Sequence, residues 1–364
     1  MEDDKLHEDC ALFGVFGHSE AANMTYLGLY SLQHRGQEST GIVSSDDREF
    51  HAEISMGLVA DTFTRDRLAR LPGKLAIGHN RYSTTGASLL KNAQPILVSY
   101  SEGSLALAHN GNLTNASTIR RELVEKGSIF NSTTDSEVII HLIATSSEVG
   151  LVARLIEALH RVEGAYCLLA LSKDQLIGVR DPSGFRPLSL GRIDNGWVLT
   201  SETCSLDLID AQFVRDIEPG EILIIDRNGV DSLYPLPSKK RSQCIFELIY
   251  FSRPDSDVFG RNVHLVRKTM GRNLVQELPV EADLLIPVPD SGVPAALGYA
   301  EASSIPFDMG LIRNHYVGRT FIEPQQSIRH FGVKIKLNAN RQLLEGKRVI
   351  IVDDSIVRGT TSRK

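Results

Sequence analysis

The pattern of apolar and polar positions changes along the chain. Up to residue 226, short apolar runs alternate with glycine-rich turns, and such runs predict strands. The clearest lie at residues 75–77, 105–108, 166–171 and 221–225. Two longer stretches, 136–147 and 151–161, carry apolar residues at helical spacing, and Gly164 follows the second as a helix stop. The N-terminal part is therefore predicted to hold more strands than helices.

A different pattern begins after residues 234–241 (YPLPSKKR), where two prolines and a basic cluster are typical of a linker. Beyond it, helical spacing and apolar runs predict a helix, a strand, a second helix and a second strand. These lie at residues 264–278, 283–288, 294–302 and 348–352. Such alternation indicates βαβ units on a parallel sheet. We therefore expect one domain at 10–233, a linker and junction at 234–255, and a second domain at 256–364.

Composition and charge narrow the classes of function. The 364 residues are 42% apolar, which is enough for ordinary buried cores. The net charge is −6 and no long basic run is present, so a nucleic-acid or membrane-surface binder is not expected. The acidic start MEDDKLHEDC lacks the features of a signal peptide, and no apolar stretch approaches the ~18 residues of a membrane span. We predict a cytoplasmic protein with small-molecule partners.

Cys10 begins a short apolar run, CALFGVFG, and a cysteine in such a place is usually a buried structural residue. Four blocks follow it in order: LQHRGQEST (32–40), GHNRYSTTG (78–86), AHNGNLTNA (108–116) and TTDSEVI (133–139). Together they resemble the class II, Ntn-type glutamine amidotransferases, in which a cysteine becomes the mature N-terminus. The resemblance implies an Ntn-hydrolase αββα sandwich at 10–233 and a propeptide at 1–9.

The same resemblance assigns roles to single residues. Cys10 would attack the side-chain amide of glutamine, with its own α-amino group, which titrates near ~7.7–8.0, as base. Asn110 and Gly111 would donate to the oxyanion of the tetrahedral intermediate. Arg81 would bind the α-carboxylate of glutamine, and Asp135 its ammonium.

Each of these residues also has a plainer interpretation. Arg81 and Asp135, taken singly, are typical of surface or ion-pair positions, and HNGN (109–112) is typical of a tight turn with glycine at positive φ. We interpret His79 and His109 as hydrogen-bonded structural residues, because the Ntn mechanism needs no imidazole. Arg35 is expected to shape the surroundings of the nucleophile without a chemical step.

The run RVIIVDDSIVRGTTS (348–362) places a β-branched strand before two carboxylates and a loop of small and hydroxyl residues. Main-chain N–H groups of such a loop bind phosphate, while Asp353 and Asp354 can face ribose hydroxyls or magnesium. Two solvated aspartates at the end of a Rossmann-like strand are the alternative. The run resembles the phosphoribosyl pyrophosphate (PRPP) signature of type I phosphoribosyltransferases. This implies PRPP contacts from Asp353, Asp354, Ser355, Arg358, Gly359, Thr360, Thr361 and Ser362, of which 358–362 take the 5-phosphate.

Two further segments match the same fold. IPVPDSGV (286–293) resembles the loop that receives pyrophosphate, which implies PRPP contacts from Asp290 and Ser291. Ser291, Asp353 and Asp354 would then contact magnesium. Residues 312–326 resemble the flexible loop that closes over PRPP and helps to form an ammonia channel.

A class II glutaminase followed by FELIYFSRPDS (246–256) and a PRPP signature resembles the amidophosphoribosyltransferase family, which performs the first committed step of de novo purine synthesis. The implied reaction converts glutamine, PRPP and water into phosphoribosylamine, glutamate and pyrophosphate. Ammonia released from a Cys10 thioester would displace pyrophosphate from C1 of the ribose. The resemblance further implies Mg²⁺, feedback inhibition by purine nucleotides, and a homo-oligomer, a homotetramer in this family.

One departure concerns the second domain. The family continues past the PRPP loop, so the chain resembles a C-terminally truncated member with an incomplete phosphoribosyltransferase α/β domain, and we expect it to lack phosphoribosylamine synthesis. In the branch with a propeptide, four cysteines hold one 4Fe-4S cluster, of which the first would be Cys244 and the other three would lie beyond Lys364. A cysteine also stands at this place in members without a cluster. Cys167 and Cys204 are expected to be structural.

Three rival functions stay open at this point. Glucosamine-6-phosphate synthase and asparagine synthetase share the glutaminase domain, but neither has a PRPP signature. A non-catalytic nucleotide-binding relative would need a blocked N-terminus at Cys10.

Overall fold

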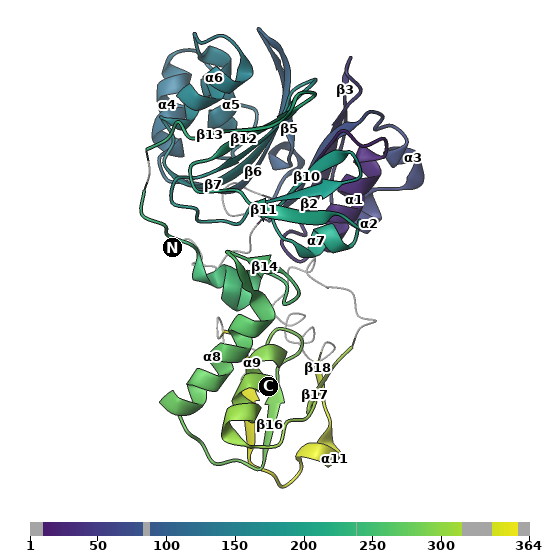
Figure 1. The fold of residues 1–364 in the computed structure, drawn as a ribbon, viewed down its shortest axis with the longest axis vertical. Coiled ribbons are helices and arrows are strands. Elements are labelled where there is room, and N and C mark those ends of the chain that lie inside the picture. The colour runs from purple at the N-terminus through teal and green to yellow at the C-terminus, as the bar shows by residue number, and fades with distance from the viewer. Residues whose placement is uncertain (1–9, 83–87, 238, 315–336, 356–364) are drawn as a thin grey trace. The chain divides into compact units, whose positions relative to one another are not determined.

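A computed structural model describes residues 10–82, 88–237, 239–314 and 337–355. It divides into two compact units (Figure 1). The first unit runs to Ile245 and includes Asp257–Gly260, and the second comprises Phe246–Ser256 and the residues from Arg261. The division after Ile245 falls inside the segment 234–255 that we predicted as a linker and junction. Each unit is described below by itself.

Two antiparallel sheets form the centre of the first unit. In the described residues, the first sheet has the strand order β11-β9-β10-β1-β4-β2-β3, so that β1 lies in its middle. Its strands are β1 Ala11–Phe16, β2 Ser39–Ser45, β3 Phe50–Met56, β4 Leu75–Arg81, β9 Ser189–Ile193, β10 Gly196–Thr200 and β11 Gln212–Asp216. The second sheet has the order β13-β12-β8-β7-β6-β5. Its strands are β5 Ile96–Tyr100, β6 Gly103–Leu113, β7 Gly164–Leu171, β8 Leu176–Arg180, β12 Ile222–Asp226 and β13 Gly229–Leu233.

Helices cover the outer faces of both sheets (Figure 1). The first sheet packs against α1 Ala21–Ser31, α2 Val59–Thr62, α3 Arg65–Leu68 and α7 Cys204–Asp207. The second packs against α4 Ala116–Glu125, α5 Glu137–Thr145 and α6 Leu151–Leu159. The remaining elements are the 3-10 helix η1 Leu90–Asn92 and β14 Asp257–Val258. This four-layer arrangement confirms the αββα sandwich.

The sequence of β1 shows how the layers arise. Successive side chains of a strand point to opposite faces of its sheet. Phe13 and Val15 accordingly belong to the core between the sheet and its helices, whereas Leu12 belongs to the core between the two sheets. Because both faces are covered, the strand is apolar along its length, as the run CALFGVFG indicated.

The second unit contains a parallel pair of strands. β16 Leu284–Pro287 and β19 Val349–Val352 pair in the register Leu284↔Val349 to Pro287↔Val352. Their core is formed by Leu285, Ala296, Tyr299 and Val352. The other elements are η2 Glu247–Phe251, β15 Arg261–Asn262, α8 Val263–Glu277, α9 Val293–Ser303, β17 Leu311–Arg313, β18 Leu337–Ala339 and α11 Arg341–Leu344. The helices and the parallel pair confirm the α/β pattern predicted for this part.

Candidate functional site

Cys10 lies directly before β1, at the end of the first sheet where several predicted site residues meet. It is 7% exposed, and its Sγ is 3.5 Å from the carbonyl oxygen of Tyr82. The β1–β4 ladder pairs Ala11 with Asn80, so the antiparallel register brings Cys10 beside Arg81 at the end of β4. Residues about 70 positions apart thus become neighbours through the sheet.

Arg81 is buried, with 2% of its surface exposed. Its Nη1 is 3.3 Å from Oε2 of Glu38, and the β2–β4 ladder pairs it with Ser39. Arg81 is therefore not a surface residue. The ion pair that was the other plain interpretation of Arg81 is present. A buried guanidinium at this place suits a bidentate carboxylate ligand.

His79 links the two sheets beneath these residues. Its Nε2 donates to the carbonyl oxygen of His109 on β6 at 3.0 Å. Burial lowers the pKa of His79 to about 3, and burial also lowers the pKa of His109, whose Nδ1 bonds Oγ of Ser136 at 2.9 Å. Both rings are therefore neutral near pH 7 and hold the sheets in register, as structural histidines do. Each ring forms a hydrogen bond through one nitrogen. The other nitrogens, Nδ1 of His79 and Nε2 of His109, have no hydrogen-bond partner in the described part of the chain.

Asn110 and Gly111 lie on β6, next to that link. The tight turn considered for HNGN is wrong, because the ladder pairs Asn110 with Cys167 and Gly111 with Tyr166. Gly111 nonetheless has φ +149°, and a Cβ there would be 2.1 Å from the oxygen of Ala165, so the position requires glycine.

The amide of Asn110 is fully buried, and neither its nitrogen nor its oxygen has a hydrogen-bond partner among the described residues. Leaving a buried polar group without a partner costs about 1–3 kcal/mol. A ligand oxygen that accepted from the amide N–H would recover part of that cost. This observation fits the oxyanion role that the resemblance implied.

Asp135 is anchored to the far end of the same strand. Its Oδ2 accepts from the main-chain N–H of Leu113 at 2.8 Å, and its Oδ1 is 3.9 Å from Nδ1 of His109. It is 7% exposed, which makes the surface interpretation wrong for this residue too.

The loop that carries Asp135 is built by residues that the sequence analysis missed. The Glu137 carboxylate accepts from the main-chain N–H groups of Asn131 and Ser132, each at 2.8 Å. Arg120 donates to the carbonyl oxygen of Ser132 at 3.0 Å, and Oδ1 of Asn92 accepts from the N–H of Thr133 at 2.9 Å. Only the run of polar residues at 131–136 hinted at such a loop.

Arg35 contacts the nucleophile directly through the main chain. Its Nε donates to the carbonyl oxygen of Cys10 at 3.1 Å, and its Nη1 to Oε1 of Glu202 at 2.6 Å. Arg35 thus lies where the sequence analysis expected it. Glu202 had no role in that analysis.

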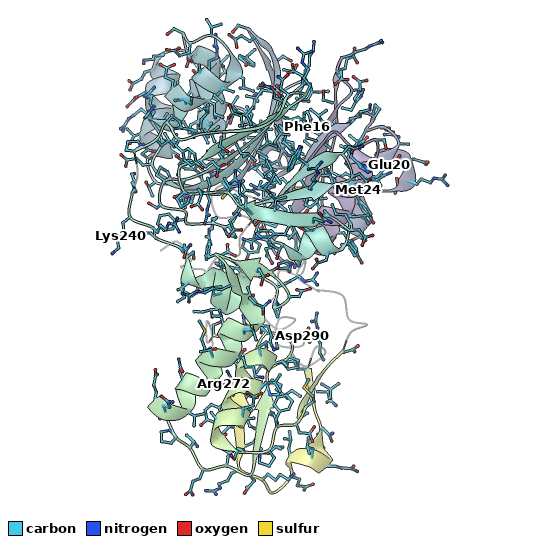
Figure 2. All side chains as sticks on the ribbon, in the orientation of Figure 1. Phe16, Glu20, Met24, Lys240, Arg272 and Asp290 are labelled. Carbon is cyan, nitrogen blue, oxygen red and sulfur yellow. The ribbon has the colours of Figure 1, made fainter. Side chains whose placement is uncertain are left out.

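In the second unit, the loops after β16 and β19 leave the same edge of the parallel pair, as the shared end Pro287↔Val352 requires. A cavity of about 350 Å³ beside this edge is lined by Ser291, Asp353 and Asp354, with Arg267 of α8 also in its wall. Asp290 does not line it and instead pairs with Arg313; Figure 2 labels Asp290 in the loop after β16. Three of the predicted PRPP residues are therefore brought together.

The carboxylates of this cavity offer oxygen ligands, which magnesium prefers. Burial, followed by the charge of Asp354, raises the pKa of Asp353. Oδ2 of Asp354 is buried and has no hydrogen-bond partner within the described ranges. Ser291, Asp353 and Asp354 thus fit a magnesium ion, although no group of three or more acidic, histidine or cysteine residues that could hold a metal by itself occurs in the described part.

Several predictions fall outside the described residues. These are the propeptide 1–9, most of the PRPP-covering loop 312–326, and the phosphate contacts Arg358, Gly359, Thr360, Thr361 and Ser362. Ser355 is described and follows Asp354, whose Oδ1 accepts from its hydroxyl at 2.8 Å.

The four cysteines do not gather around one centre. Cys10, Cys167 and Cys204 are buried in the first unit, and the Cys167 thiol is directed at the carbonyl oxygens of Arg186 and Pro187. Cys244 is partly exposed, and its main-chain N–H donates to the carbonyl of Phe185. The role of Cys244 as a cluster ligand stays a prediction, because the other three ligands were expected beyond Lys364. Within the described ranges, no helix has the length and apolarity to cross a bilayer.

Comparison with known proteins first gives the class. Residues 79–207 match the family model described as a glutamine amidotransferase domain, so the first unit is such a domain. Over its full length the chain is 54% identical to the amidophosphoribosyltransferase of Rhizobium etli, covering 75% of that protein, and 54% identical to amidophosphoribosyltransferase 1 of Arabidopsis thaliana, a chloroplastic protein of which it covers 64%. The chain belongs to the amidophosphoribosyltransferase family.

Solved structures agree. One, described as the allosteric regulatory enzyme of purine biosynthesis, has a TM-score of 0.92 at 50% identity over 97% of this chain and 76% of its own. Another is the glutamine PRPP amidotransferase of Bacillus subtilis complexed with ADP and GMP, with a TM-score of 0.91 at 49% identity over 97% of this chain and 77% of its own. These structures therefore agree with the family and with both parts of the predicted fold class, the glutamine amidotransferase sandwich and the phosphoribosyltransferase α/β domain.

Proposed function

We propose that the first unit hydrolyses glutamine through Cys10 and that the ammonia serves the family's reaction with PRPP. The observation that supports this most directly is the convergence of three segments. The β1–β4 register brings Cys10 beside the buried Arg81, and His79 of β4 bonds the carbonyl of His109, the residue before the unpartnered Asn110 on β6. The two sheets are joined at this place by the bond from His79 to His109.

In the proposed mechanism, Arg81 binds the α-carboxylate of glutamine and Asp135 its ammonium, which fixes the side-chain amide against the thiol. The Cys10 sulfur bonds to the amide carbon while its proton moves to the α-amino nitrogen of the same residue. Asn110 and Gly111 donate to the oxyanion. The C–N bond then breaks, the amine takes that proton and leaves as ammonia, and water hydrolyses the thioester to glutamate.

This mechanism needs a free α-amino group on Cys10, so we propose that residues 1–9 are removed before the enzyme acts. In the family's reaction, ammonia would then displace pyrophosphate from C1 of PRPP bound at the cavity of the second unit, a step that the incomplete second domain was expected to lack. Asp353, Asp354 and Ser291 would hold magnesium, which neutralises charge on the departing pyrophosphate when it is bound. Since the Bacillus subtilis relative was solved with ADP and GMP, we further propose that purine nucleotides inhibit this protein. From the resemblance to the family we also propose that it acts as a homotetramer.

Glutamate release by the purified chain tests the central step. Cys10→Ser should abolish glutamine hydrolysis and leave the thermal midpoint nearly unchanged, because the smaller hydroxyl fits the same place. Cys167→Ser is the matched control, since its thiol is buried against main-chain carbonyls and a hydroxyl can donate there as well. Equal activity of wild type and Cys10→Ser would exclude Cys10 as nucleophile, and intact mass of the active protein shows whether residue 10 is first.

A second assay addresses the family reaction. Pyrophosphate is measured with magnesium, PRPP and ammonium, which bypasses the glutaminase. Release that persists in Cys10→Ser and is lost in Asp353→Asn would support synthesis at the second unit. Intact glutaminase without any release would confine the activity of this chain to glutamine hydrolysis.

A further inference from the structure

Glu202 is a buried carboxylate in the first unit, directly beyond the strand β10 that neighbours β1. Its side chain is fully buried, and a guanidinium and an imidazole reach the same oxygen. Nη1 of Arg35 lies 2.6 Å and Nε2 of His34 lies 2.8 Å from Oε1. Burial alone would raise the pKa of Glu202, but the charges of His34 and Arg35 and their hydrogen bonds outweigh it and hold that pKa well below its usual range. Glu202 is therefore an ion within the protein interior.

The Arg35 guanidinium divides its donors between this carboxylate and the nucleophile. Its Nε donates to the carbonyl oxygen of Cys10 at 3.1 Å, and its side chain is fully buried as well. The next residue, Gly36, lies so close to β4 that a Cβ there would be 2.7 Å from the carbonyl of Asn80. Both features bring this loop against the end of the sheet at which Cys10 and Arg81 lie.

We propose that Glu202 is a positioning residue for the nucleophile: through Arg35 it fixes the carbonyl of Cys10, and with it the directions of the thiol and of the main-chain nitrogen. The thiol and the proposed base belong to one residue, so a rotation about the Cα–C bond of Cys10 displaces both. Loss of the carboxylate removes the 2.6 Å bond to Nη1 and so weakens the hold on the guanidinium that donates to that carbonyl. This inference rests on the proposed glutaminase function and extends it.

The pair is nearly neutral as a whole, so its expected contribution is alignment rather than added charge at the thiol. Arg81, which is proposed to bind the α-carboxylate of glutamine, pairs with Glu38, and Asp135, proposed to bind the ammonium, accepts from the main-chain N–H of Leu113. Loss of the carboxylate should therefore lower the turnover rate and leave substrate affinity in place.

Glu202→Gln tests this with little change in shape. We expect kcat for glutamine hydrolysis to fall roughly 10- to 100-fold, as for a misplaced reacting group, while KM stays within about twofold. Alkylation of Cys10 by iodoacetamide should slow as well, and this readout does not need glutamine. Glu202→Asp keeps the charge and should recover part of both rates.

The matched control is Glu221→Gln. Glu221 is also a fully buried carboxylate that pairs with an arginine, Arg215, at 2.7 Å, and the contacts recorded for it are to Arg215, Ser232 and Glu218. It should lose stability as Glu202→Gln does, yet keep kcat. If both variants retain wild-type kcat, or if both lose it in proportion to their midpoints, Glu202 has no positioning role.

If Glu202→Gln does not fold, Arg35→Lys tests the same inference. The lysine keeps a buried cation for Glu202. Its ammonium lacks the forked donors of a guanidinium, which reach both the Cys10 carbonyl oxygen and Oε1 of Glu202. Loss of kcat with a wild-type midpoint supports the inference, and unchanged kcat overturns it. A wild-type chain that hydrolyses no glutamine would instead refute the proposed function.

Discussion

The two units place their candidate site residues in different ways. In the first unit, Cys10, Arg81 and Asn110 lie on or beside central strands, between cores that fill both faces of the sheets. In the second unit, Asp353 and Ser291 lie on loops beyond a two-stranded parallel pair, whose core in the described residues has four buried members. A nucleophile needs fixed geometry before its substrate arrives, and strands supply it. Loops at a sheet edge suit a phosphorylated ligand that brings its own charge.

The largest loss of stability in the first unit is expected from a substitution at Gly111, where a side chain has no room. Gly111→Ala should lower the free energy of unfolding by at least about 3 kcal/mol, because the new Cβ would overlap the carbonyl of Ala165. Gly103→Ala is the control on the same strand, since it also has positive φ, +123°, with nothing within 4 Å of its Cβ, and should cost about 1 kcal/mol. Urea denaturation measures both. Equal costs would mean that φ alone matters.

The charge of Asp135 tests whether the strand-borne residues bind substrate. Asp135→Asn retains an oxygen that can accept from the N–H of Leu113. We expect kcat/KM for glutamine to fall about 10- to 100-fold through KM, because a charge-assisted bond to the ammonium is lost. Asp231→Asn, at an exposed position of β13, should leave the kinetics as they are. A wild-type KM in Asp135→Asn would contradict the assignment.

His79 makes the stability of the first unit depend on pH. Its pKa is about 3 in the folded chain and near 6.5 when unfolded, so between these values the unfolded state binds the extra proton. Acidification from pH 6.5 should therefore destabilise the unit, by up to roughly 1.4 kcal/mol per pH unit from this residue. His79→Gln, which can still donate to His109, should show a shallower slope between pH 6.5 and 5. Parallel slopes would disprove this contribution.

The smallest effect is expected at Ile351 in the second unit. This residue of β19 is 59% exposed, so Ile351→Thr should change stability by no more than about 0.5 kcal/mol. Ile77→Thr, at a fully buried position between the sheets, should cost about 2–4 kcal/mol. A large loss at Ile351 would show that β19 is covered in solution.

Apolar periodicity predicted most strands and helices that serve these sites, including β6, β7, α5, α6, α8 and β19. It missed α1, because buried Thr25, Gly28 and Ser31 interrupt its apolar face. It also ended β6 at residue 108, since the polar HNGN gives no sign that the strand continues to Leu113. The spacing of apolar residues along the chain indicates which apolar side chains are buried. It does not indicate polar side chains that are buried for function.

The motifs gave the candidate site residues, but not the residues that support them. Glu137 and Glu202 resemble ordinary surface carboxylates in sequence. The partner of Glu202, Arg35, stands 167 positions away, and such pairs become visible only after the sheets have formed. Contacts of the phosphate loop at 358–362 remain predictions, because those residues lie outside the described ranges.

The central place of β1 has a consequence for synthesis on the ribosome. The main-chain N–H of Leu12 donates to Oγ of Ser201, 189 positions later. The strand β1 pairs with both β4 and β10. At about 5–20 residues per second, on the order of 10–40 s separate the translation of Cys10 from that of the segment that anchors it. During this interval β1 can pair with β4 but has an open edge where β10 belongs. The nucleophile is thus translated early and positioned late, so any cleavage before it that depends on the folded site must wait until Glu202 has emerged.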